Sequence, residues 1–227
     1  MTGGTDRQIL VGRDGFVATM TFNRPQSLNA LTAKMLDEAC VAAREIAASD
    51  ARVVILTGAG SAFCAGVDLK IVQDPDFDQA ARAAFSHSAR TFQQLLEAMT
   101  QPVIAKVRGA CMTGGLELAT SADLILAATD ARFCDTHAKY GFIPEWGMPG
   151  RLAQLIGRMR SNEMAFTAKV ISGVEAAAIG LILEAVEPDL LDQRVAEIAT
   201  TIATNDALAI SHYKARIREA VVAHAKV

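Results

Sequence analysis

A strand that runs into two glycines and then a helix is the feature that most constrains how this chain can fold. Residues 103–107 read Val-Ile-Ala-Lys-Val, Gly114 and Gly115 follow, and Glu117 stands one turn into the apolar segment after them. A glycine turn that opens a helix leaves backbone N–H groups free and presents the positive end of the helix dipole. Such a turn suits an anion, or an oxygen that becomes negative during a reaction.

A second turn of the same kind lies upstream. The apolar run at residues 53–57 (Val-Val-Ile-Leu-Thr) is followed by Phe63-Cys-Ala-Gly-Val-Asp68. Two such turns can each give one N–H to the same oxygen, and the nearby carboxylate of Glu117 can move protons. The two turns therefore predict a site for a carbonyl or carboxyl oxygen.

Apolar strands alternate with helical stretches along the chain. A hairpin is expected around Asp14-Gly15, a helix is expected to begin at a Thr32 N-cap, and the polar segment 70–82 is expected to be a mobile loop. Apolar residues at helical spacing mark a final helix: Ile210, Tyr213, Ile217 and Val221. Strands separated by helices predict an α/β fold with crossover connections.

Composition narrows the class of protein. The 227 residues carry a net charge of −3, and no run of about 18 apolar residues occurs, so we expect neither nucleic acid nor a membrane as partner. The N-terminus lacks an apolar leader, which favours a cytoplasmic location. Free thiols in a reducing compartment, with no metal site, are expected because no metal-ligand spacing links the four cysteines, Cys40, Cys64, Cys111 and Cys134.

Four motifs stand in a fixed order: Asn23-Arg-Pro-Gln-Ser-Leu-Asn-Ala-Leu31, residues 53–69 with both the strand and the first turn, Pro102 through Ala119 with the second turn, and Ala122-Asp-Leu124. Together they resemble the enoyl-CoA hydratase/isomerase (crotonase) superfamily, from Phe16 to about residue 205. The resemblance implies a crotonase-like spiral of ββα repeats with a C-terminal helical region. It also implies an acyl-CoA substrate, no cofactor beyond the coenzyme A of that substrate, and a homotrimer or dimer of trimers.

On this resemblance the chain divides in two. Residues 1–185 form the core with the CoA-thioester site, and residues 186–227 form a helical segment that contributes to oligomer contacts. The oxyanion hole maps onto the backbone N–H groups of Val67 and Gly114, and the first catalytic glutamate maps onto Glu117. The resemblance assigns substrate binding to Gln26, Leu28, Ala65, Asp68 and Lys70. Lys70 is expected near the phosphates, and Asp68 also suits a turn or a helix cap.

The sequence departs from the family at its second glutamate. That position, fourteen residues beyond Asp123, holds His137, and the family's usual third glycine is replaced by Thr113. Glu145 offers a carboxylate eight residues beyond His137. Either side chain is a candidate second acid/base, although Glu145 also fits a solvated loop and His137 a hydrogen-bonded packing residue.

With these residues, the resemblance implies an enzyme, an enoyl-CoA hydratase-like lyase that adds water to a 2-enoyl-CoA thioester through an enolate. A double-bond isomerase that uses Glu117 or Glu145 as proton shuttle is the main alternative. Hydrolysis of a C–C bond in a diketone remains open because His137 would tolerate it. An acyl-CoA-binding relative with little turnover also remains open, because the second glutamate is absent.

Overall fold

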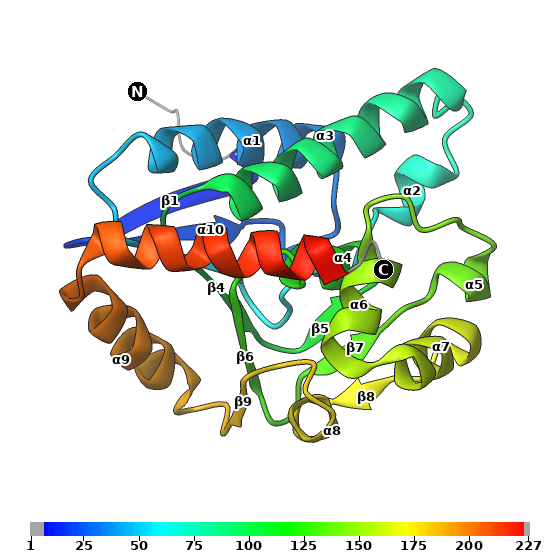
Figure 1. Ribbon diagram of the computed structural model, residues 1–227. Coiled ribbons are helices and arrows are strands. Elements are labelled where there is room, and N and C mark those ends of the chain that lie inside the picture. Colours follow the sequence, from blue (N-terminus) through cyan, green and yellow to red (C-terminus); the bar gives the residue numbers. More distant parts are fainter. Residues whose placement is uncertain (1–6, 225–227) are drawn as a thin grey trace.

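The computed structural model describes residues 7–224. The ends of the two predicted segments 1–185 and 186–227 therefore lie partly outside the described residues, and so does the N-terminal stretch that lacks an apolar leader. Two sheets form its framework (Figure 1). The six-stranded sheet has the order β1-β2-β3-β4-β6-β9 and is parallel except for the β1–β2 hairpin. Its strands are β1 Ile9–Asp14, β2 Val17–Phe22, β3 Val53–Gly58, β4 Val103–Val107, β6 Leu124–Ala128 and β9 Glu184–Val186.

The second sheet is made of short strands that follow those of the first. It has the order β5-β7-β8, with β5 Ala110–Met112, β7 Arg132–Cys134 and β8 Ile171–Ser172. The chain runs from β4 through β5 into a helix, and from β6 through β7 into the next helix. An isolated backbone β-bridge pairs Cys64 with Cys111 and extends this sheet to the turn after β3. This repetition confirms the α/β spiral of ββα units.

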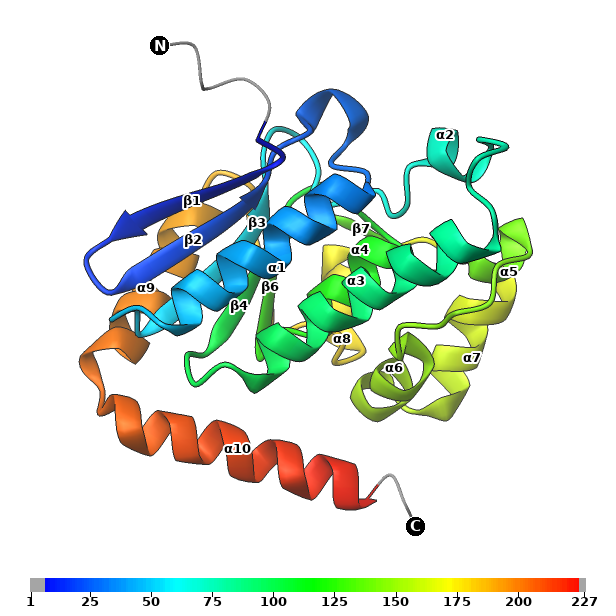
Figure 2. The same ribbon diagram turned by 90° about the horizontal axis from the view of Figure 1, so that it is seen from above.

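Helices cover both faces of the larger sheet (Figure 2). Helices α1 (Ala33–Ala47) and α3 (Gln79–Ala98) pack together on one face, and α9 (Leu191–Thr204) lies on the other. Strand β3 is almost entirely buried, as expected for a parallel strand covered on both sides. The hairpin turn at Gly15 and the Thr32 cap, whose hydroxyl accepts from Met35 N at 3.1 Å, are confirmed.

The expected loop over residues 70–82 is wrong at both ends. A short helix, α2 (Leu69–Val72), occupies its start, and α3 begins before its end. Aspartates placed just before each helix explain the difference. The Asp68 side chain accepts from Lys70 N at 3.1 Å, and the Asp78 side chain accepts from Ala81 N at 2.8 Å. Each carboxylate thereby satisfies a free N–H of the first helical turn.

The remaining helices are α4 Gly114–Ala119, α5 His137–Tyr140, α6 Met148–Ile156, α7 Arg158–Thr167, α8 Gly173–Ala178 and α10 Ala207–His224, with a 3-10 turn at Pro25–Ser27. The final helix is confirmed, and two of the residues that mark it are largely exposed, Tyr213 at 72% and Ile217 at 61%. The predicted division at residue 185 falls inside β9, and α9 packs on the core sheet. Whether the C-terminal segment makes oligomer contacts stays a prediction.

Candidate active site

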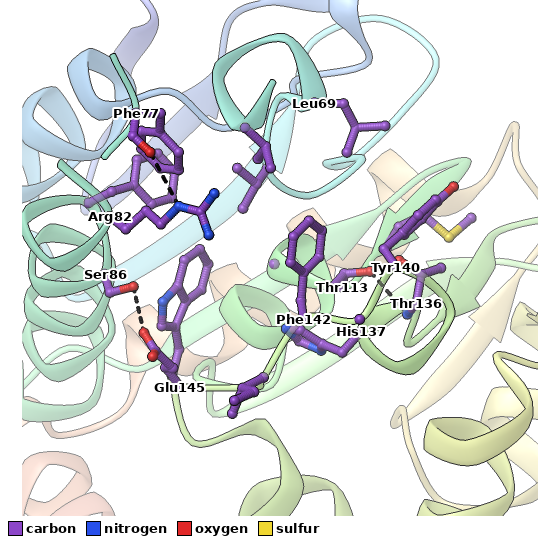
Figure 3. Close-up of a pocket in the computed structure, with 18 of the residues that line it drawn as sticks. Leu69, Phe77, Arg82, Ser86, Thr113, Thr136, His137, Tyr140, Phe142 and Glu145 are labelled. Carbon is purple, nitrogen blue, oxygen red and sulfur yellow. Dashed lines mark hydrogen bonds between the residues drawn. The ribbon is translucent and has the colours of Figure 1, made fainter. Parts of the chain in front are cut away.

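A cavity of about 440 Å³ opens where α2 and α3 face the segment of residues 136–146 (Figure 3). Much of its wall is apolar, with Phe77, Phe85 and Trp146 among the lining side chains. The polar lining side chains are Arg82, Ser86, Thr113, Thr136, His137, Tyr140 and Glu145. An apolar cavity with a few convergent polar groups is the usual form of a small-molecule site.

The two glycine turns meet at this cavity. Val67 and Gly114 both line it. A Cβ on Gly66, whose φ is +92°, would stand 3.0 Å from Met112 O and 3.4 Å from Gly114 N. Only a glycine allows the turns to approach this closely.

The N–H groups of Val67 and Gly114 have no hydrogen-bond partner within residues 7–224. For Val67 the reason lies in its neighbours, because Leu31 N donates to Gly66 O at 2.7 Å and Asp68 N donates to Leu31 O at 3.1 Å. Leu31 therefore bridges the peptides on either side of Val67 and leaves the N–H of Val67 unused. Gly114 begins α4, where a helix has no internal acceptor for its N–H.

Glu117 is buried, with 1% of its surface exposed. Burial raises the pKa of its carboxyl to about 7, against the opposing effects of His137, Arg151 and a hydrogen bond from Met148 N at 3.4 Å. Its carboxylate therefore adjoins the segment that carries Trp146 to the cavity, although Glu117 itself does not line that cavity. A carboxyl with a pKa near neutrality can both accept and donate a proton under ordinary conditions.

The backbone carbonyl of Glu117 is held by several donors. It accepts from Gln93 Nε2 at 3.0 Å, Ser121 Oγ at 3.0 Å and Arg151 Nη2 at 3.3 Å. The Arg151 guanidinium also bonds to Trp146 O at 2.8 Å and pairs with Glu97 at 3.4 Å. These contacts fix the helix turn that carries the carboxylate.

His137 lines the cavity and is paired with an aspartate. Its Nδ1 lies 2.7 Å from Oδ1 of Asp135, which is 3% exposed. Glu145 also lines the cavity, but it is exposed and accepts from Ser86 Oγ of α3 at 2.9 Å. The structure thus brings both candidates for the second acid/base to one pocket (Figure 3).

The predicted substrate-binding residues separate into two groups. Ala65 lines the cavity, and its N–H donates to Leu28 O at 3.0 Å, which places the loop of Gln26 and Leu28 beside the first turn. Gln26, Leu28, Asp68 and Lys70 do not line this cavity. Asp68 forms an ion pair with Arg24 at 3.0 Å, and Lys70 is exposed on α2. Their role in binding stays a prediction.

Thr113 occupies a strained backbone conformation at the position where the resemblance led us to expect glycine. Its φ of 46° and ψ of −103° are unusual for a residue with a side chain. Two hydrogen bonds oppose the strain: Thr113 N donates to Cys134 O at 2.8 Å, and Thr136 N donates to Thr113 Oγ1 at 3.1 Å. The threonine thereby links the second glycine turn to the segment that carries His137.

Sequence reasoning missed two contributors to the site. Asp135 was not singled out, although its position two residues before His137 is a spacing at which a carboxylate can reach a ring nitrogen. Asn29 was noted only as part of a motif, yet it is fully buried and its amide donates to Ala59 O and Ala62 O at 2.9 and 2.7 Å. These bonds brace the loop that leads into the first glycine turn.

The fold and site together define a crotonase-type protein. A solved structure described as an enoyl-CoA hydratase from Bacillus anthracis superposes with a TM-score of 0.90 at 34% identity, covering 93% of this chain and 83% of that one. A solved enoyl-CoA hydratase/carnitine racemase from Magnetospirillum magneticum superposes with a TM-score of 0.89 at 32% identity, covering 94% and 80%.

Sequence comparison agrees. A short-chain-enoyl-CoA hydratase of Clostridium acetobutylicum is 35% identical over 211 residues, which are 92% of this chain and 80% of the relative. A crotonyl-CoA hydratase of Syntrophomonas wolfei is 33% identical over 213 residues, which are 93% of this chain and 81% of the relative. The pattern of the enoyl-CoA hydratase/isomerase family matches residues 12–226. The chain belongs to this family of enzymes.

Proposed function

We propose that this enzyme is a hydratase that adds water across the C2–C3 double bond of a 2-enoyl-CoA thioester. One observation carries the proposal: two backbone N–H groups without a partner among the described residues lie on turns that abut at Gly66 and Gly114, and the helix that Gly114 begins carries a buried carboxyl with a pKa of about 7. The names of the relatives support it, since they include a short-chain-enoyl-CoA hydratase and a crotonyl-CoA hydratase.

In this mechanism the thioester oxygen lies between the N–H groups of Val67 and Gly114. When a water oxygen bonds to C3, the electron pair of the double bond moves toward the thioester and the oxygen becomes enolate-like. Two positioned donors stabilise that charge, and loss of one such donor costs roughly 3–4 kcal/mol in other enzymes. The side chain of Val67 takes no part because the donors are backbone groups.

Glu117 accepts the proton that water loses, and a second group gives a proton to C2. Glu145 and His137 are the candidates for the second group, and both line the cavity. The sequence of steps adds one water, leaves no charge behind and uses no metal or redox cofactor. A carboxyl with a pKa of about 7 suits this task because it is partly ionised at neutral pH.

The coenzyme A portion of the substrate is proposed to run along the loop of Gln26 and Leu28 and past Ala65. Leu28 is 45% exposed, and its carbonyl already bonds to Ala65 N, so this edge is open beside the first turn. Lys70, exposed on neighbouring α2, is proposed to meet the phosphates. Asp68, which is ion-paired with Arg24, is proposed to hold this edge as well as to bind substrate.

A double-bond isomerase is the second candidate. The observation in its favour is Glu145, a second carboxylate on the wall of the same cavity. Such a group, with water excluded, would carry a proton between C2 and C4.

We also propose a homotrimer or a dimer of trimers. Large apolar side chains are exposed on α7 and α10, with Met159 at 82%, Phe166 at 75% and Tyr213 at 72%. Exposed apolar groups in such numbers are typical of protein contact surfaces. A cytoplasmic location also stays a prediction. Within residues 7–224, no helix is both long and apolar enough to cross a bilayer.

Mass spectrometry of a panel of enoyl-CoA esters in ¹⁸O-water tests the proposed reaction. Hydration incorporates the heavy oxygen into the product. Isomerisation gives an unlabelled product of unchanged mass and would overturn the hydratase assignment. Absence of any conversion across the panel would leave an acyl-CoA-binding protein and would overturn both enzymatic assignments.

A further inference from the structure

The wall of the cavity carries a hydrogen-bonded pair that the two-glutamate arrangement of the family lacks. His137 Nδ1 lies 2.7 Å from Asp135 Oδ1, and the backbone N–H of His137 donates to the same oxygen at 3.0 Å. Asp135 is 3% exposed, and the His137 side chain is 12% exposed. A buried carboxylate is costly unless it is bonded, so the pair is held in one geometry.

The pair is also tied to the second glycine turn. Thr136 N donates to Thr113 Oγ1 at 3.1 Å, and Thr113 N donates to Cys134 O at 2.8 Å. Gly114, one of the two proposed oxyanion donors, is the next residue after Thr113. The histidine is therefore fixed with respect to the position at which the thioester oxygen is proposed to lie.

The bond to Asp135 decides which histidine nitrogen serves the cavity. An ionised carboxylate only accepts hydrogen bonds, so Nδ1 must carry a proton. Nε2 has no hydrogen-bond partner within the described residues, and it is the ring nitrogen left for a substrate. A fixed tautomer with a free second nitrogen is how a neighbouring carboxylate orients histidines in acid–base catalysis and in metal sites.

We infer that Asp135 is a positioning residue that makes His137 the second acid–base group of the site, in preference to Glu145. This inference rests on the proposed hydration. Glu117 takes a proton from water as the O–C3 bond forms, and Nε2–H of the imidazolium gives its proton to C2 as the enolate collapses. The proton then returns from Glu117 to His137 through solvent, so atoms and electrons balance over a turnover.

The charge of Asp135 is central to this role because it stabilises the imidazolium. Glu145 is less suited, since its carboxylate is exposed and bonded to Ser86 Oγ at 2.9 Å. Glu117 lies within electrostatic reach of both members of the pair. An Asp→Asn change beside a catalytic histidine in other enzymes preserves geometry and greatly lowers turnover.

A double-mutant cycle tests the inference. In the wild-type background, Asp135→Asn should lower kcat about tenfold or more while KM stays within about threefold, because the amide oxygen still accepts both bonds and only the charge is lost. In a His137→Glu background the same change should raise kcat, because Asp135 now repels or binds the new carboxyl. Asp130→Asn removes an equally negative, exposed side chain a few residues upstream and should leave both backgrounds unchanged.

Equal losses from Asp135→Asn in the two backgrounds would show a merely structural aspartate and overturn the inference. So would a larger loss of kcat from Glu145→Gln than from His137→Gln. Suppose that the wild-type protein hydrates a thioester. If Glu117→Gln then abolishes hydration and His137→Gln does not, the inference fails while the proposed function stands. If the wild-type protein hydrates nothing, the proposed function fails.

A measurement without turnover gives an independent answer. ¹⁵N NMR of the neutral imidazole, assigned with His137→Gln among the 4 histidines of the chain, should show a protonated Nδ1 and an unprotonated Nε2. The opposite tautomer would leave no proton acceptor toward the cavity when the ring is neutral. That result would overturn the positioning role of Asp135 whatever the reaction.

Discussion

At the scale of single residues, burial decides the chemistry of Glu117. The same glutamate on an exposed first turn would only complement the helix dipole. Here desolvation raises its pKa to about 7 from an ordinary value of 4.5. Glu117 therefore binds its proton more tightly in the folded protein than in the unfolded chain, and its contribution to stability falls as the pH rises from about 4.5 to about 7.

Glu117→Gln should remove this dependence. The difference in free energy of unfolding, variant minus wild type, should increase by up to about 3 kcal/mol from pH 4 to pH 8, because Gln never ionises. Urea unfolding at a series of pH values measures the difference. Glu145→Gln, at an exposed position, is the control and should change the free energy of unfolding little at any pH. A flat difference for Glu117→Gln would contradict the raised pKa.

Gly66→Ala tests the contact between the two turns. The new Cβ would press on Met112 O and Gly114 N at a φ that L residues rarely adopt, and would move one proposed donor from its partner. We expect kcat to fall about 100-fold and the free energy of unfolding to fall by about 1–2 kcal/mol. Gly150→Ala is the matched control. A Cβ added at Gly150, in α6, would meet no other side chain or distant backbone of the described residues within 4 Å, so this change should stabilise the helix slightly.

At the scale of elements, α10 is held to the core by a charged residue instead of an apolar stripe. Lys214 Nζ lies 2.7 Å from Asp123 Oδ2 and donates to Leu96 O and Gln101 O at 3.0 Å each. Burial lowers the pKa of Lys214, and the pairing with Asp123 opposes that effect. The apolar residues Leu208, Tyr213 and Ile217 of α10 are 68%, 72% and 61% exposed, so they do not hold the helix to the core.

Lys214→Met should therefore loosen α10. We expect the free energy of unfolding to fall by about 2 kcal/mol, less than for a fully buried pair because the Asp123 side chain is 32% exposed. Hydrogen exchange should accelerate across residues 207–221 before it accelerates in the sheet. Arg216→Met, an exposed neighbour on the same helix, is the control. Equal exchange rates in the two variants would show that Lys214 does not anchor the helix.

At the scale of the whole molecule, the site depends on elements that lie far apart in the chain. The turns at Gly66 and Gly114, helices α2 and α3, and the segment 136–146 meet only when the spiral is complete. Occupation of the cavity should therefore stabilise the entire fold.

Butyryl-CoA, a saturated thioester with no double bond to hydrate, should raise Tm. A ligand at 100 times its Kd adds about 2.7 kcal/mol, which corresponds to roughly 5–10 °C for a chain of this size. Scanning calorimetry with free coenzyme A as the comparison measures how much the acyl group contributes. No shift with either ligand would contradict the assignment of the ligand class.

Local structure was predictable because it depends on neighbours in the chain. The Thr32 cap, the Gly15 turn and the strands at residues 53–57 and 103–107 follow from short-range rules and are confirmed. The segment 70–82 was mispredicted because its proline and acidic residues suggested a loop. Its aspartates instead cap helices.

The sequence by itself determined the turn at Gly15, the strands at residues 53–57 and 103–107, and the place of Glu117 in a helix that glycines open, because backbone sterics and capping act over a few residues. Only the tertiary structure decided that Glu117 is buried, that Asp135 faces His137, that Glu145 bonds to Ser86 and that α10 is anchored through Lys214. Desolvation and charge pairing depend on atoms from distant segments. Those effects set the acid–base properties of the site.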